Sequence, residues 1–155
     1  MCIRDSYGCP IYEEELGRRY RLNLTNRPFW LNNEFVFLGE IPENKSADID
    51  DTALVHKTNE GIFIITGCSH SGIINIINYA KQVCRDERIL GVLGGFHFLK
   101  KSEEELEEIC SLMLKSGVNP EYPLYPCHCC DLKSKIIMSK FFNVQEVCTG
   151  DVLNC

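Results

Sequence analysis

From residue 61 onward, the sequence alternates short apolar runs with segments of helical periodicity. The apolar runs are residues 61–67, 88–95 and 122–126, and the helical patterns are residues 71–84, 102–117 and 132–142. The run RILGVLGG (88–95) is almost continuously apolar, which is typical of a strand buried on both faces of a parallel sheet. This alternation predicts parallel strands joined by helices, and therefore an α/β layered architecture.

The part of the chain before residue 68 predicts strands without helices between them. EFVFLGE (34–40) is bounded by asparagines and a proline, so it predicts one strand. Residues 52–58 and 61–67 flank a short polar segment, which predicts a β-hairpin. At the other end, residues 144–155 predict one or two final strands.

Two of the predicted helices carry start signals. In residues 71–84, apolar side chains recur at helical spacing after Ser71, which we expect to be the N-cap. In residues 102–117, Ser102 and Glu105 have the spacing of a capping box, and the acidic first turn suits the helix dipole. Both segments therefore predict amphipathic helices that pack on a sheet.

Charge and composition restrict the partners and the compartment. The net charge is −6, which argues against nucleic acid or an anionic membrane as a partner, since both require basic patches. No apolar run is long enough to span a bilayer, and the first ten residues lack a signal-peptide core. Several of the ten cysteines, such as Cys84 and Cys110, lie in apolar stretches, as reduced buried thiols do. We therefore expect a cytoplasmic protein.

Three of the four histidines occupy equivalent places in this pattern. His70, His97 and His128 each follow a predicted strand and precede a predicted helix. The carboxyl ends of parallel strands meet at one edge of a sheet, where α/β proteins bind their ligands. Imidazole is the commonest protein ligand for zinc-like ions. The pattern predicts a metal site at this edge, whereas His56 lies within a predicted strand and is interpreted as a structural or surface residue.

Two other chemistries are compatible with the same turns. GCSHS nearly matches the G-x-S-x-G elbow of serine hydrolases, with Ser69 as nucleophile, although a serine replaces the second glycine. Cys127, Cys129 and Cys130 surround His128, which suggests a non-catalytic cysteine-rich metal or redox module. Structural zinc usually takes two spaced ligand pairs, and a second pair is lacking here.

The first six residues, MCIRDS, resemble the translation of a sequencing adaptor. We therefore expect residues 1–6 to be an artefact and residues 7–155 to form part of a longer domain.

The blocks FLGEIP, DDTALVHKT, GIFIITGCSHSGIINIINYAK, GVLGGFHF and PCHC occur in this order between residues 37 and 129. Together they resemble the C-terminal half of metallo-β-lactamase-fold proteins, most closely the subgroup named for dihydropterin ribofuranosylaminobenzene phosphate synthase. The resemblance implies half of an αββα sandwich. It also implies that an H-x-H-x-D-H motif, which these 155 residues lack, belongs to the missing half.

The resemblance implies a metal-dependent enzyme, either a hydrolase or a phosphoribosyl-type transferase, with two zinc-like ions. His70 and His128 match ligand histidines of the family, and His97 lies near the place where other members have a metal-bridging aspartate. The expected substrate is a small molecule, with phosphorylated compounds among the candidates. A phosphate would meet the backbone N–H groups of Ser71 and Gly72 at the start of a helix.

Overall fold

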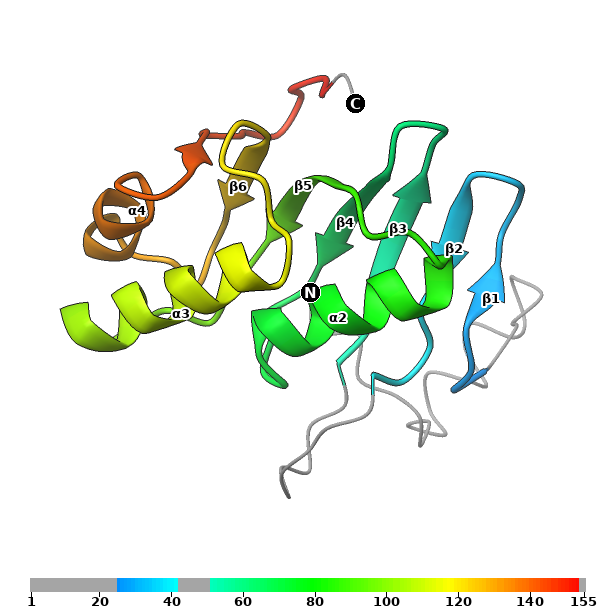
Figure 1. The fold of residues 1–155 in the computed structure, drawn as a ribbon, viewed down its shortest axis with the longest axis horizontal. Coiled ribbons are helices and arrows are strands. Elements are labelled where there is room, and N and C mark those ends of the chain that lie inside the picture. Colours follow the sequence, from blue (N-terminus) through cyan, green and yellow to red (C-terminus); the bar gives the residue numbers. More distant parts are fainter. Residues whose placement is uncertain (1–24, 42–50, 154–155) are drawn as a thin grey trace.

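The computed structural model describes residues 25–41 and 51–153, in which seven strands form one sheet (Figure 1). The strands stand in chain order: β1 (Phe29–Trp30), β2 (Phe35–Phe37), β3 (Ala53–Lys57), β4 (Ile62–Thr66), β5 (Ile89–Gly94), β6 (Pro123–Pro126) and β7 (Asn143–Val144). Three helices join the later strands: α2 (Ile73–Cys84), α3 (Glu103–Lys115) and α4 (Leu132–Met138). The expected adaptor segment, residues 1–6, lies outside the described residues.

The sheet changes character at β4. Strands β1 to β4 pair antiparallel, and β3 and β4 form the predicted hairpin around Thr58 and Gly61. Strands β4 to β7 pair parallel, with one helix in each connection. The predicted α/β architecture and the alternation of strands and helices are therefore confirmed. In the part of the chain that the structure describes, no helix is both long and apolar enough to cross a membrane.

One local prediction was wrong, and two others were correct in the kind of element but not in its bounds. The N-cap of α2 is Gly72, not the expected Ser71, and the helix has no side-chain cap. The backbone is left-handed at Ser69 (φ 60°), and the Ser71 N–H donates a hydrogen bond to the carboxylate of Asp51. Helix α4 ends at Met138, where residues up to 142 were expected to be helical. In residues 144–153 the only strand is the end of β7, which has two residues. The capping box of Ser102 and Glu105 is confirmed at the start of α3.

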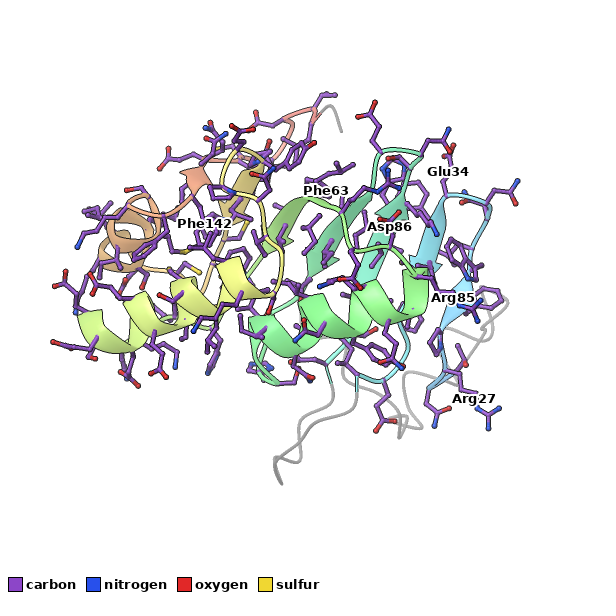
Figure 2. The ribbon with its side chains drawn as sticks, viewed as in Figure 1. Arg27, Glu34, Phe63, Arg85, Asp86 and Phe142 are labelled. Atoms are coloured by element: carbon purple, nitrogen blue, oxygen red, sulfur yellow. The ribbon has the colours of Figure 1, made fainter. Side chains whose placement is uncertain are left out.

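The two faces of the sheet are buried to different degrees. One row of cross-strand neighbours is fully buried in the core that the three helices share: Val36, Val55, Ile64, Val92 and Leu124. The next row faces the other way, because side chains alternate along strands. Its members are apolar but only half-buried: Phe37, Leu54, Ile65, Leu93 and Tyr125. Figure 2 shows the side chains between sheet and helices, with Phe142 among them.

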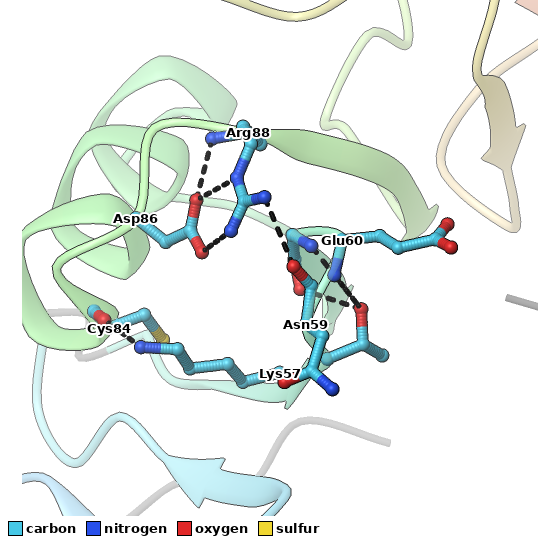
Figure 3. A network of polar contacts seen from close by, with 8 residues as sticks. Lys57, Asn59, Glu60, Cys84, Asp86 and Arg88 are labelled. Carbon is cyan, nitrogen blue, oxygen red and sulfur yellow. Dashed lines mark hydrogen bonds and ion pairs between the residues drawn. The ribbon is translucent and has the colours of Figure 1, made fainter.

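A polar network joins the end of α2 to the β3–β4 hairpin (Figure 3). The ammonium group of Lys57 donates a hydrogen bond to the carbonyl of Cys84 at 2.5 Å. This contact places a positive charge at the carboxyl end of α2. Arg88 donates two side-chain bonds to Asp86, at 3.0 and 2.8 Å, and a third to the carbonyl of Asn59 at 3.0 Å. These hydrogen bonds from Arg88 lower the pKa of Asp86 to about 2.

Replacing Arg88 by alanine is expected to raise the pKa of Asp86 from about 2 toward its ordinary value. The folded-state pKa lies below the unfolded one, so the pair stabilises the fold above about pH 4 and ceases to do so as the pH falls toward about 2. A titration of the Asp86 carboxyl carbon by NMR measures the pKa directly. Lys140→Ala, at a distant surface pair with Glu103, is the matched control and leaves it unchanged. A pKa that stays near 2 in Arg88→Ala would contradict the assignment.

Candidate functional site

The turns that follow β4, β5 and β6 meet at one edge of the sheet. Because these strands are parallel, the three turns lie at their carboxyl ends. Backbone hydrogen bonds tie the turns together: Gly95 N–H donates to Gly67 at 2.7 Å, and Cys127 N–H donates to Gly94 at 2.7 Å. The turns carry His70, His97 and His128, so the expected convergence of the histidine-bearing segments is observed.

His70 and His97 form a pair at this edge. Their ring centroids lie 5.0 Å apart, with the rings nearly perpendicular. His70 is mostly covered, with 23% of its side chain exposed, whereas His97 is exposed and has a left-handed backbone (φ 56°). Loss of surrounding water, then the charges of His70 and Lys101, lower the pKa of His97, against an opposing effect of Asp51. A lowered pKa favours the neutral imidazole, which is the form that binds metals.

The carboxylate of Asp51 lies beside the imidazole ring of His70. This carboxylate is buried, at 8% exposure, and one oxygen lies 3.4 Å from Nδ1 of His70. The other oxygen accepts the Ser71 N–H. A carboxylate beside Nδ1 favours the tautomer with the proton on that atom, which leaves Nε2 free to bind a metal. Sequence patterns did not identify Asp51, because only the fold brings it to His70.

His128 has different neighbours from those of the His70–His97 pair. It is exposed, and its Nε2 is 2.7 Å from Sγ of Cys68. Cys68, His128 and Cys129 each offer a ligand atom, and these three atoms lie within 4.8 Å of one another. Cys68 was not among the predicted site residues. Its only signal in the sequence is its place in GCSH, two residues before His70.

The other thiols near this edge have different surroundings. Cys127 donates to the carbonyl of Tyr125 at 3.4 Å. Cys130 is buried in the hydrophobic core, and burial raises its pKa to about 12, so it remains a thiol. Of the three cysteines of PCHCC, only Cys129 therefore takes part in a group of possible metal ligands among the described residues.

Ser69 does not have the surroundings of a nucleophile. Its hydroxyl is buried, at 1% exposure, and donates to the carbonyl of Gly95 at 2.6 Å. Its other hydrogen-bond partner is Thr66, at 3.3 Å. An elbow serine needs an exposed oxygen and a histidine base, so the serine-hydrolase interpretation is wrong.

The predicted phosphate contacts, Ser71 and Gly72, lie before α2 as expected. Their backbone N–H groups already have acceptors within the chain: Asp51 for Ser71, and the Ser69 carbonyl, at 3.1 Å, for Gly72. The Ser71 hydroxyl is buried without a hydrogen-bond partner. Both N–H groups are therefore already paired within the chain, and phosphate binding here stays a prediction.

Among solved structures, the chain matches the crystal structure of Tm1679, described as a metal-dependent hydrolase of the beta-lactamase superfamily. The TM-score is 0.70 at 28% sequence identity, over 88% of this chain and 58% of that one. The fold of this chain is thus that of a metallo-β-lactamase superfamily structure. No family model matches the chain.

Two curated relatives come from Methanocaldococcus jannaschii. Uncharacterized protein MJ0448 is 26% identical over 144 residues, which cover 84% of this chain and 54% of that protein. The 7,8-dihydropterin-6-methyl-4-(beta-D-ribofuranosyl)-aminobenzene-5'-phosphate synthase is 26% identical over 93 residues, covering 60% of this chain and 31% of that protein. The chain thus spans about half of the first relative and less of the second. The synthase similarity agrees with the expected subgroup only at the level of distant homology.

Proposed function

We propose that this chain supplies part of the metal centre of a metal-dependent hydrolase with the metallo-β-lactamase fold. The observation that carries the proposal is the approach of His70 and His97 at the carboxyl edge of parallel strands, where their ring centroids lie 5.0 Å apart. His128 lies at the end of the next strand on the same edge. Similarity to a solved metal-dependent hydrolase supports the same chemistry.

The donor set suits zinc-like ions, and the roles of the residues follow from their contacts. Asp51 orients His70 and keeps its proton on Nδ1, so that Nε2 is the ligating atom. His97 and His128 each present an exposed side chain at the same edge. Bound divalent ions would supply an activated water and polarise the scissile bond of the substrate.

We propose further that the centre holds two ions, and that the remaining ligands come from an H-x-H-x-D-H segment outside these 155 residues. The chain covers 58% of the matched structure, and the half-buried apolar row on its sheet leaves room for a second layer. The substrate is proposed to be a small ester or phosphoester. A phosphoribosyl-transfer reaction is the second candidate, supported by the synthase similarity.

The test begins with the genomic DNA upstream of the codon for Tyr7. We expect an open frame that encodes H-x-H-x-D-H, and we call its product, joined to residues 7–155, the extended protein. This protein should bind two zinc ions per chain and hydrolyse chromogenic phosphoesters or carboxylic esters. Chelation should abolish turnover, and zinc should restore it. An extended protein that holds no metal, or whose turnover survives chelation, would refute the proposal.

A further inference from the structure

The three potential ligands Cys68, His128 and Cys129 form a cluster beside the histidine pair. Cys68 comes from the turn after β4, whereas His128 and Cys129 come from the turn after β6, on the far side of β5 (Figure 1). Their ligand atoms lie within 4.8 Å of one another, and the contact between Cys68 and His128 is 2.7 Å. Two adjacent residues of one turn are thus joined by a third ligand from another turn.

Gly95 makes the space that the cluster occupies. A Cβ atom at this position would lie 2.5 Å from Sγ of Cys129 and 2.6 Å from Cε1 of His128. Any side chain would therefore displace both ligands. Glycine at this position allows the β5 turn to pass directly under the cluster, as is common where a backbone approaches a ligand closely.

The sulfur of Cys129 is held in a defined place. It accepts the backbone N–H of His97 at 3.1 Å and lies 3.6 Å from the carbonyl oxygen of Cys68. The Cys129 side chain is buried, at 6% exposure, whereas His128 is exposed. The cluster thus has one side anchored in the protein and one side open to solvent.

We propose that Cys68, His128 and Cys129 bind one metal ion through two thiolates and one imidazole. This inference rests on the proposed function in one respect: His128 is also a ligand in the metal centre of the proposed hydrolase. At a tetrahedral zinc site, with bonds of about 2.0 to 2.3 Å, ligand atoms lie about 3.5 Å apart. The contact between Cys68 and His128, at 2.7 Å, is shorter than that value, and all three ligand atoms lie within 4.8 Å of one another. Small side-chain rotations are therefore sufficient to form the site.

The ligand set also determines which ion is bound. Thiolate ligands select zinc or monovalent copper over magnesium and calcium, which prefer oxygen. Three protein ligands leave a fourth position, and the exposure of His128 places it on the solvent side. Binding releases the thiol protons of Cys68 and Cys129, because the thiolate is the ligating form.

Zinc K-edge X-ray absorption tests the proposal without any measurement of activity. The 155-residue chain is loaded with one equivalent of zinc in a phosphine reductant, which contributes no sulfur ligand. We expect two sulfur scatterers at about 2.3 Å together with nitrogen or oxygen at about 2.0 Å. Cys68→Ser and Cys129→Ser should each remove one sulfur. Cys127→Ser, in the same turn but outside the cluster, should keep both.

Each outcome decides the question. A chain that binds no zinc, or a spectrum with nitrogen and oxygen alone, overturns the proposal. So does a two-sulfur spectrum that persists in Cys68→Ser, because other cysteines would then hold the ion. Cys68 is only half-buried, so this variant keeps the test valid if Cys129→Ser fails to fold. His70→Ala should retain both sulfurs. The cluster can thus be upheld even when the extended protein hydrolyses nothing.

Discussion

Replacement of His70 by alanine is expected to reduce metal-dependent hydrolysis by the extended protein more than 100-fold. Loss of a residue that only orients a metal ligand costs about 10- to 100-fold, so loss of the ligand itself should exceed that range. The measurement is kcat/KM on the ester that gives the highest turnover, with zinc content determined on the same samples. A parallel loss of bound zinc would place His70 in the metal centre rather than in substrate binding.

Asp51→Asn separates positioning from ligation. The amide keeps the size of the side chain but removes the negative charge beside Nδ1 of His70. We expect a loss of about 10- to 100-fold in zinc affinity, with activity restored at high zinc concentration. His56→Ala is the control, because its ring stacks on Phe35 at 4.5 Å within the sheet. Undiminished kcat/KM in His70→Ala would contradict the proposed function.

The approach of the histidine-bearing turns could be predicted because it depends on strand order alone. His70, His97 and His128 each follow a strand of the same parallel group, so their place at one edge follows from the alternation of strands and helices. Which histidine faces which neighbour depends on side-chain direction. The pairing of His70 with His97, and of His128 with Cys68, is therefore known only from the structure.

Two residues of the site have no local sequence pattern. Asp51 precedes β3 and reaches His70 because β3 and β4 pair antiparallel, which sets Ala53 opposite Thr66. Cys68 reaches His128 across the turn after β5, where glycines keep the backbone close. The same local geometry explains the wrong N-cap at Ser71, since its amide is drawn to Asp51. Long-range register, which periodicity does not specify, determines all three.

Ile64→Ala and Ile65→Ala are expected to differ strongly in their effect on the free energy of unfolding. The two residues are neighbours on β4 with identical side chains, but Ile64 is fully buried beneath the helices and Ile65 lies on the half-buried face. Ile64→Ala should cost about 2–5 kcal/mol through lost burial and the cavity it leaves. Ile65→Ala should cost less than about 2 kcal/mol in the 155-residue chain. Urea unfolding followed by circular dichroism measures both.

The same pair tests whether a second layer covers the sheet in the extended protein. Ile65 shares its row with Leu54 and Leu93, so a layer packed on that row would bury all three. The cost of Ile65→Ala should then rise in the extended protein to the range of Ile64→Ala, while the cost of Ile64→Ala stays the same. Equal costs of Ile65→Ala in the two proteins would mean that the added segment packs elsewhere. The partial exposure of the apolar row would then need another explanation, because contact between water and a large apolar surface is unfavourable.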